Sequence, residues 1–251
     1  MSTIDALINL FEPISLSQMD EVRLLNRMDT KFAFRADQLP GILEQAQSSY
    51  YILDINHVRQ QRYETLYFDT PGHLLYLNHH NKRMNRYKVR SRRYVDSDQC
   101  FFEIKIKTNK GRTVKERNRH KGSQEIIAGK QEQLLASRTR LTPAMLMPAL
   151  WVDFSRITLV NHGMSERITI DSGITFRFGS EVCSYPGVVI AEVKQDHSGS
   201  SLLSHHLHSL HIPGIKISKY CLGTISLNHH IKHNNFKQRL IHLNNLNHDT
   251  C

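Results

Sequence analysis

Lysine and arginine recur at every second position in several segments of this chain. The stretch 85–95 (NRYKVRSRRYV) carries Arg86, Lys88, Arg90 and Arg92 at this spacing. Side chains two residues apart on a β-strand point to the same face of the sheet, so an extended conformation places these cations in one row. Such rows bind phosphate oxygens and stabilise the charge that spreads over a phosphoryl group during its transfer. The same alternation aligns further cations in other segments: Lys31, Lys105, Lys107, Lys115, Arg117, Arg119, Arg167 and Lys194.

Like charges that face each other across strands destabilise a sheet. The polar faces of segments 85–95, 100–107 and 112–119 carry mostly Lys and Arg, with Glu103 as their one acid. A solvated sheet face usually mixes the two signs, so this pattern favours a surface that a polyanion covers. A basic, solvent-exposed sheet is the alternative interpretation for any single strand.

Carboxylates on the same faces are candidates for holding a metal ion. Phosphoryl transfer uses a divalent cation bound by oxygen ligands. Glu192, two residues from Lys194, is the best candidate, and we predict that it holds the cation. For each acid the alternative is an internal salt bridge with a neighbouring Lys or Arg. The weaker candidates are Glu103, Asp171 and Asp29.

Aromatic side chains distinguish phosphate binding from the recognition of bases. RNA-binding sheets expose aromatic rings that stack on bases. Here Phe32, Phe34 and Phe102 alternate away from the cations, as does Tyr87. A basic face without stacking rings is typical of phosphate binding, so no nucleic-acid partner is expected. An RNA-binding barrel is the rival interpretation, which competition by short polyphosphate would test.

The elements that position these residues are predicted to be strands joined by short turns, with helices outside. Eight antiparallel strands can close into a barrel whose charged faces point inward. The sequence therefore predicts an α+β fold of about eight antiparallel strands flanked by helices, and leaves open whether the strands close into a barrel with a basic lumen. The expected strands are 27–35, 62–69, 85–95, 100–107, 112–119, 151–160, 165–178 and 187–195. The expected helices are 36–48, 73–82, 123–138, 143–149 and 199–210.

Length, charge and cysteine content limit the class of protein. The 251 residues suit one domain, and a net charge of +10 points to an anionic partner. No stretch approaches about 18 apolar residues and the N-terminus lacks a secretory signal, so no membrane segment and a cytoplasmic location are expected. The four cysteines stand singly, which indicates neither a disulfide framework nor a thiolate zinc site. No cysteine has a histidine neighbour arranged to activate it as a nucleophile.

Seven segments in sequence order resemble the VTC domain, the polyphosphate polymerase module of the triphosphate tunnel metalloenzymes. The resemblance spans roughly residues 20–225 and implies an eight-stranded tunnel barrel. It also implies transfer of the ATP γ-phosphate to a growing polyphosphate chain with Mn²⁺ or Mg²⁺. ATP and inorganic polyphosphate are then the partners, while a membrane-protein partner and the oligomeric state are left open. The segments are MDTKF, ETLYFDT, RYKVRSRRY, FFEIKIK, TVKER, AEVK and KISKY.

The resemblance implies roles for individual residues. The residues that would bind and polarise phosphates at the reacting centre are Lys88, Arg90, Lys105 and Arg167, and Glu192 would hold the metal. Further phosphate contacts are predicted at Lys31, Arg92, Lys115, Arg156, Lys194, Ser218 and Lys219.

Two departures from the family pattern bear on the activity. Lys88 stands where an arginine is often found. A lysine offers one ammonium group in place of the two parallel N–H donors of a guanidinium. Related triphosphatases and class IV-type cyclases carry ExExK on the first strand, where this chain reads Arg27-Met28-Asp29-Thr30-Lys31. This difference favours the polymerase. A metal-dependent tri- or polyphosphate hydrolase and a non-catalytic polyphosphate- or nucleotide-binding module are the alternatives.

The tunnel domain is expected to span residues 1–232. Residues 233–251 form a polar tail rich in His and Asn. The histidine spacing matches no metal-ligand signature, so a solvated helix with a frayed end is expected.

Overall fold

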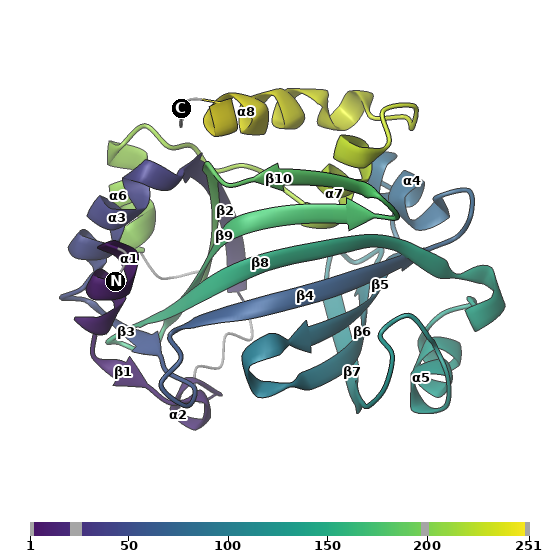
Figure 1. Cartoon of the computed structure of the whole chain (residues 1–251), viewed down its shortest axis with the longest axis horizontal. Helices are drawn as coiled ribbons and strands as arrows, with labels where there is room; N and C mark the ends of the chain where they lie inside the picture. The colour runs from purple at the N-terminus through teal and green to yellow at the C-terminus, as the bar shows by residue number, and fades with distance from the viewer. Residues whose placement is uncertain (1–2, 21–26, 197–200, 249–251) are drawn as a thin grey trace.

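The computed structural model describes residues 3–20, 27–196 and 201–248. One sheet of eleven strands, antiparallel except for one short parallel pair, dominates it (Figure 1). Eight strands follow one another in a hydrogen-bonded path, and each corresponds to a strand expected from the sequence. In path order they are β2 (Arg27–Arg35), β11 (Val188–Asp196), β9 (Glu166–Phe178), β8 (Met147–Asn161), β4 (Gln60–Asp69), β5 (Arg86–Tyr94), β6 (Gln99–Lys107) and β7 (Thr113–His120).

Three short strands raise the number above the expected eight. β1 (Pro13–Ile14) pairs in parallel with β3 (Tyr50–Leu53), which also pairs with β8, and β10 (Glu181–Tyr185) pairs with β9. Strands of two to five residues contain too few alternations for a period of two to be recognised in the sequence.

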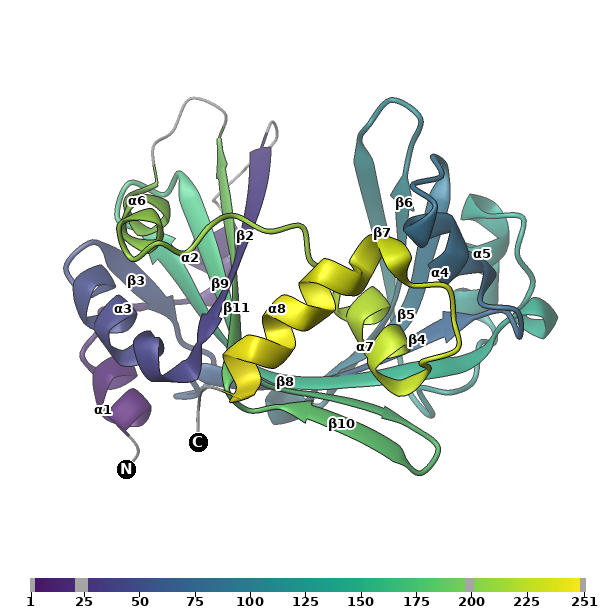
Figure 2. The same cartoon turned by 90° about the horizontal axis from the view of Figure 1, so that it is seen from above.

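The sheet curls on itself so that its two ends face each other (Figure 2). In the described part of the chain, β2 pairs with β11 and, through one isolated bridge of Phe32, with Gly214, whereas β7 pairs with β6 alone. The curl therefore has no hydrogen-bonded seam between β2 and β7. The predicted fold class, an α+β chain built on a curled antiparallel sheet, is confirmed.

Helices cover the outer face of the sheet because that face carries the apolar half of each alternating strand. On one flank, Phe32 of the sheet packs with Leu43 of α3 (Leu39–Ala46) and Leu207 of α6 (Leu202–Ser209) (Figure 1). On the other flank, Phe102 of the sheet packs with Leu135 of α5 (Lys130–Arg138). The helices are α1 (Thr3–Asn9), α2 (Leu16–Asp20), α3 (Leu39–Ala46), α4 (Leu74–His80), α5 (Lys130–Arg138), α6 (Leu202–Ser209), α7 (Lys219–Leu227) and α8 (Lys237–His248). Short 3-10 helices are Ala36–Gln38, Val95–Ser97, Pro143–Met145 and Asn234–Phe236.

Two predicted helices are shorter than expected. The helix expected over 123–138 begins only at Lys130, because Gly129 adopts φ 57° and ψ −121°, outside the helical region. The helix expected over 143–149 is one 3-10 turn, after which β8 begins at Met147.

Helices α7 and α8 lie across one end of the space that the sheet encloses (Figure 2). Tyr220 of α7 packs in the same apolar cluster as Phe176 of β9. A Cβ atom at Gly223 would lie 2.5 Å from the Phe176 ring, so only glycine allows this approach. The expected solvated tail is in fact partly packed, because Phe236 and Leu243 are buried in this cluster. In the described residues no helix has the length and apolar character needed to cross a bilayer.

Candidate active site

The inner face of the curled sheet carries one set of predicted site residues on β2, β11 and β9. Residues directly opposite each other across antiparallel strands share a face. Lys31 of β2 lies opposite Glu192 of β11, which lies opposite Thr169 of β9. One pleat further along, Lys194 lies opposite Arg167. Asp29 lies opposite Lys194 on the other side, so this arm of the sheet mixes cations with carboxylates.

The opposite arm carries a second set, on β5, β6 and β7. Lys88 lies opposite Lys105, and Lys105 lies opposite Lys115. Directly opposed side chains have Cβ atoms about 5 Å apart, so three like charges are immediate neighbours. We call these three residues the lysine row.

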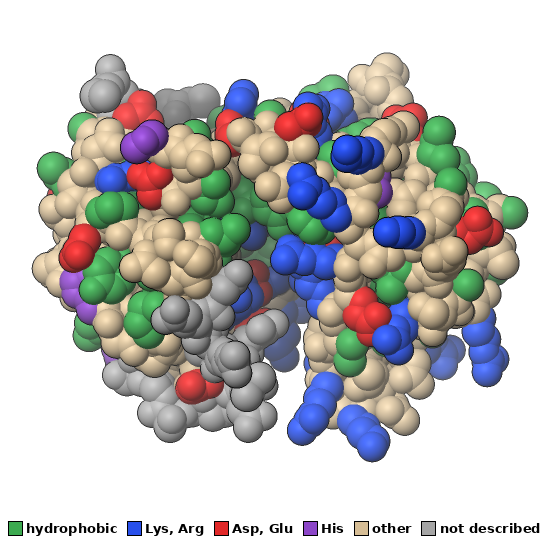
Figure 3. All heavy atoms as spheres, turned by 90° about the horizontal axis from the view of Figure 1, so that it is seen from below, with side chains coloured by type: hydrophobic (Ala, Val, Ile, Leu, Met, Phe, Trp, Pro, Cys, Tyr) green, Lys and Arg blue, Asp and Glu red, His purple; other side chains and the backbone are tan. Residues whose placement is uncertain are grey.

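The two arms face each other across the enclosed space. Lys105 on β6 and Glu192 on β11 interact electrostatically, although four strands separate theirs in the path. Lys88 and Lys31 interact in the same way. These interactions require both side chains to project into the enclosed space. Viewed from the end opposite α8, the molecule is hollowed at its centre, and Lys and Arg side chains line the recess (Figure 3).

Two of the weaker metal candidates are held in internal ion pairs. Glu103 is fully buried and pairs with both Arg90 and Lys115. Burial alone would raise the pKa of Glu103, but Arg90 and its neighbouring cations lower it well below the usual range. The alternative interpretation of this acid, an internal salt bridge, is therefore the one observed.

Asp171 is the second buried acid. Arg156 donates to its two oxygens at 2.5 and 2.8 Å, and Lys219 pairs with it as well. Burial opposes ionisation, but Arg156 and Lys219 outweigh it and hold the pKa of Asp171 well below its usual range. Asp171 thus anchors the start of α7 to the inner face.

We expect Asp171→Asn to destabilise the fold by about 3–5 kcal/mol, because it leaves two buried cations without their counter-ion. A carboxyl whose folded pKa is depressed stabilises the protein above the unfolded pKa, near 3.9, and loses this contribution as the pH falls below it. The wild type should therefore lose stability on acidification through that range more steeply than the variant. Thermal melts of both proteins between about pH 3 and 7 measure the difference, and parallel curves would contradict it.

Other cations on the inner face have only neutral partners. Lys88 donates to Ser218 Oγ at 2.8 Å, Lys31 donates to a backbone carbonyl at 3.1 Å, and Arg92 donates to Thr65 Oγ1 at 3.1 Å. Lys105 makes no hydrogen bond or ion pair with another described residue. Arg90 and burial hold the pKa of Lys105 well below its usual value. These side chains can exchange their present contacts for phosphate oxygens.

Burial and the positive charges on the inner face shift the pKa values of Tyr67 and His79. Burial alone would raise the pKa of Tyr67, but Arg90 and the cations beside it lower it to about 8. Burial lowers the pKa of His79 to about 2, with Lys88 contributing. A region that stabilises a phenolate and destabilises an imidazolium also favours the binding of an anion.

The sequence interpretation missed aromatic rings on the inner face. Tyr63 and Phe154 stack with centroids 5.0 Å apart, and the Arg92 and Arg156 guanidinium groups lie 5.3 and 5.0 Å from the Tyr63 centroid. Both rings are at most 8 % exposed, so they support the guanidinium groups and are not open for base stacking. Alternation in 62–69 could not assign Tyr63 to a face, because Tyr63 and Leu66 point to opposite faces and both are apolar.

The fold brings a histidine into contact with one of the cysteines. Cys221 Sγ lies 3.2 Å from His79 Nδ1, although 142 positions separate the two residues. Burial raises the pKa of the Cys221 thiol and lowers that of the His79 imidazole. The pair is therefore neutral, a hydrogen bond rather than the thiolate–imidazolium pair of a nucleophile.

A divalent cation fits the inner face only if its substrate supplies further ligands. In the described part of the chain no group of three His, Cys, Asp or Glu side chains converges on one point. Glu192 pairs with Lys194 at 3.2 Å, and the Thr169 hydroxyl opposite it is buried without a hydrogen-bond partner. One carboxylate with phosphate oxygens completing the shell is a common arrangement for Mg²⁺. The donor set therefore fits such a cation.

Comparison with known proteins identifies the family. The family model for the VTC domain matches residues 26–228. The chain belongs to the VTC domain family. The VTC domain here thus comprises the whole eight-strand path and α7. Among curated proteins, no relative matches the chain.

Solved structures with similar folds are distant in sequence. The PH1819 protein from Pyrococcus horikoshii OT3 is 14 % identical, with a TM-score of 0.45, over 79 % of this chain and 96 % of that chain. The Hippeastrum protein HpAC1, described as having a dominant triphosphatase activity, is 15 % identical, with a TM-score of 0.46, over 80 % of this chain and 97 % of that chain.

Proposed function

We propose that this VTC domain is a polyphosphate polymerase-like phosphotransferase that moves the ATP γ-phosphate onto a polyphosphate chain. The observation that carries the proposal is the lysine row. Three opposed lysines destabilise an empty sheet, and Glu103 pairs with only one of them, Lys115. A string of phosphates between the two arms would neutralise the row.

The reaction needs no protein nucleophile. A terminal polyphosphate oxygen attacks the γ-phosphorus, the bond between that phosphorus and the β–γ bridging oxygen breaks, and ADP leaves with the bond electrons. Lys88, Arg90 and Lys105 bind and polarise phosphates from one arm, and Arg167 does so from the other. Because these cations are already in place, they stabilise the developing charge without reorganisation.

The remaining cations position the phosphate chain along the tunnel. Glu192, with Thr169 beside it, would hold Mn²⁺ or Mg²⁺, which when bound supplies further neutralisation of the phosphate oxygens. The use of ATP accords with the predicted cytoplasmic location, which stays a prediction. The proposed chain-positioning residues are Lys31, Arg92, Lys115, Arg156, Lys194, Ser218 and Lys219.

Incubation with ATP and Mn²⁺, followed by a gel stained for polyphosphate, tests the proposal. We expect long-chain polyphosphate and an equivalent release of ADP. Release of orthophosphate without a polymer would instead identify a tri- or polyphosphate hydrolase. Tight polyphosphate binding without turnover would identify a binding module.

Polyanion binding should be accompanied by proton uptake. Burial lowers the pKa of Lys115 to about 8, and the pKa of Lys88 and of Lys105 is also below the usual value. Bound phosphates favour the charged amines and raise these pKa values, so affinity should weaken as the pH rises through about 8. Calorimetric titration with tripolyphosphate in Tris and in Hepes measures the uptake from the difference in heat. Lys105→Met should reduce it, and identical heats in both buffers would contradict the expectation.

A further inference from the structure

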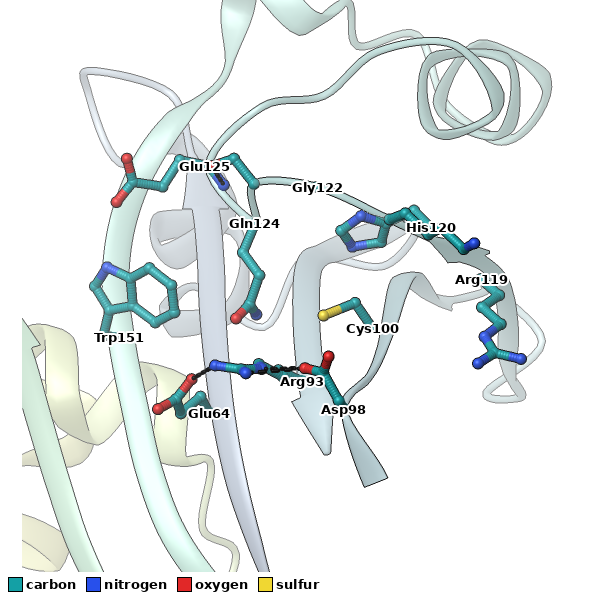
Figure 4. A pocket seen from close by; sticks show the side chains of 12 residues that line it. Glu64, Arg93, Asp98, Cys100, Arg119, His120, Gly122, Gln124, Glu125 and Trp151 are labelled. Carbon is teal, nitrogen blue, oxygen red and sulfur yellow. Dashed lines mark hydrogen bonds and ion pairs between the residues drawn. The ribbon is translucent and has the colours of Figure 1, made fainter. Parts of the chain in front are cut away.

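A pocket on the outer face of the sheet lies apart from the tunnel. Arg93 lies opposite both Glu64 and Cys100 in the strand register, so all three point away from the inner face that carries Arg92. The segment after β7 crosses over these residues and closes the pocket (Figure 4). Its volume is about 630 Å³, within the range of small-molecule sites.

One buried polar atom in this pocket lacks a partner. Gln124 Nε2 has no hydrogen-bond partner among the described residues, whereas the His120 ring shares a hydrogen bond with Ser91 Oγ at 2.9 Å. Figure 4 shows the Gln124 side chain extending into the pocket toward the ion pair of Arg93 with Asp98. A buried donor without a partner is unfavourable, so the Gln124 amide that extends into this space calls for a polar ligand.

The other walls define the chemistry of that ligand. The Trp151 ring forms one wall, and aromatic rings stack on heteroaromatic bases. Glutamine amides pair with the hydrogen-bonding edge of adenine. Exposed Lys121 at the rim can bind a phosphate. A polyphosphate chain is disfavoured because three carboxylates also line the pocket, those of Glu64, Asp98 and Glu125.

We propose that this pocket binds a purine nucleotide, with the base between Trp151 and Gln124 and the phosphate at Lys121. The site is distinct from the tunnel and does not depend on the proposed polymerase activity. The strands that shape it, β5 to β7, also carry the lysine row on their other face, so an occupied pocket contacts the same strands as the tunnel.

The only tryptophan of the chain lies in this pocket, so its fluorescence reports on the site. The experiment titrates the full-length protein with AMP while saturating tripolyphosphate occupies the tunnel. We expect a saturable change in Trp151 emission with a dissociation constant below about 1 mM. Tripolyphosphate alone should leave the emission unchanged.

Gln124→Ala should weaken AMP binding at least about tenfold. Gln133→Ala, a matched change on the exposed side of α5, should bind AMP like the wild type. The proposal is overturned if AMP produces no saturable change, if tripolyphosphate alone changes the emission, or if the Gln124 variant binds normally. Circular dichroism of each variant verifies that it is folded.

Discussion

Lys105→Met should lower polyphosphate synthesis at least about hundredfold while making the protein more stable. The substitution removes the central charge of the lysine row, which forms no ion pair with a carboxylate among the described residues and interacts with Glu192 only across the enclosed space. Relief of cross-strand repulsion is worth up to about 1 kcal/mol. For a chain of this size that corresponds to a rise in melting temperature of about 2–4 °C. Product gels and thermal melts measure the two effects.

The stability gain should depend on pH in a defined direction. The folded pKa of Lys105 is depressed, so the unfolded chain binds more protons and this residue destabilises the fold below the ordinary lysine pKa. The gain from Lys105→Met should therefore be full below the folded pKa of Lys105 and shrink as the pH rises from there toward about 10.4. Lys110→Met, on the exposed turn between β6 and β7, is the control and should change neither activity nor stability. A destabilised Lys105 variant would contradict our account of the row.

Glu192→Gln should lower metal-dependent turnover at least about hundredfold and, unlike Lys105→Met, destabilise the protein. Burial alone would raise the pKa of Glu192, but Lys31 and Lys194 outweigh it and lower the pKa well below the usual range. Its side chain is 25 % exposed, so the loss should be about 2 kcal/mol, less than for a fully buried pair. The loss should be present at neutral pH and disappear as the pH falls below about 4.3.

Glu44→Gln on the exposed surface of α3 is the matched control and should behave like the wild type. Full metal-dependent turnover by Glu192→Gln would show that the cation is held elsewhere. The two tunnel variants together separate catalysis from folding, because both lose activity while their stabilities change in opposite directions.

The alternation of residue types determined much of this protein before any tertiary contact was considered. In segments such as 85–95 and 100–107, a period of two assigns Lys88 and Lys105 to one face and Phe102 to the other. Side-chain direction along a strand is a local property, so these assignments, the eight main strands and the basic inner face followed from the sequence.

Which inner-face groups meet was decided only by the tertiary structure. The pairing of Asp171 with Lys219, the stack of Tyr63 on Phe154 and the contact of Cys221 with His79 join distant segments. Such contacts depend on strand register, on the curl of the sheet and on the docking of α7. These are properties of long-range packing, for which local periodicity carries no information.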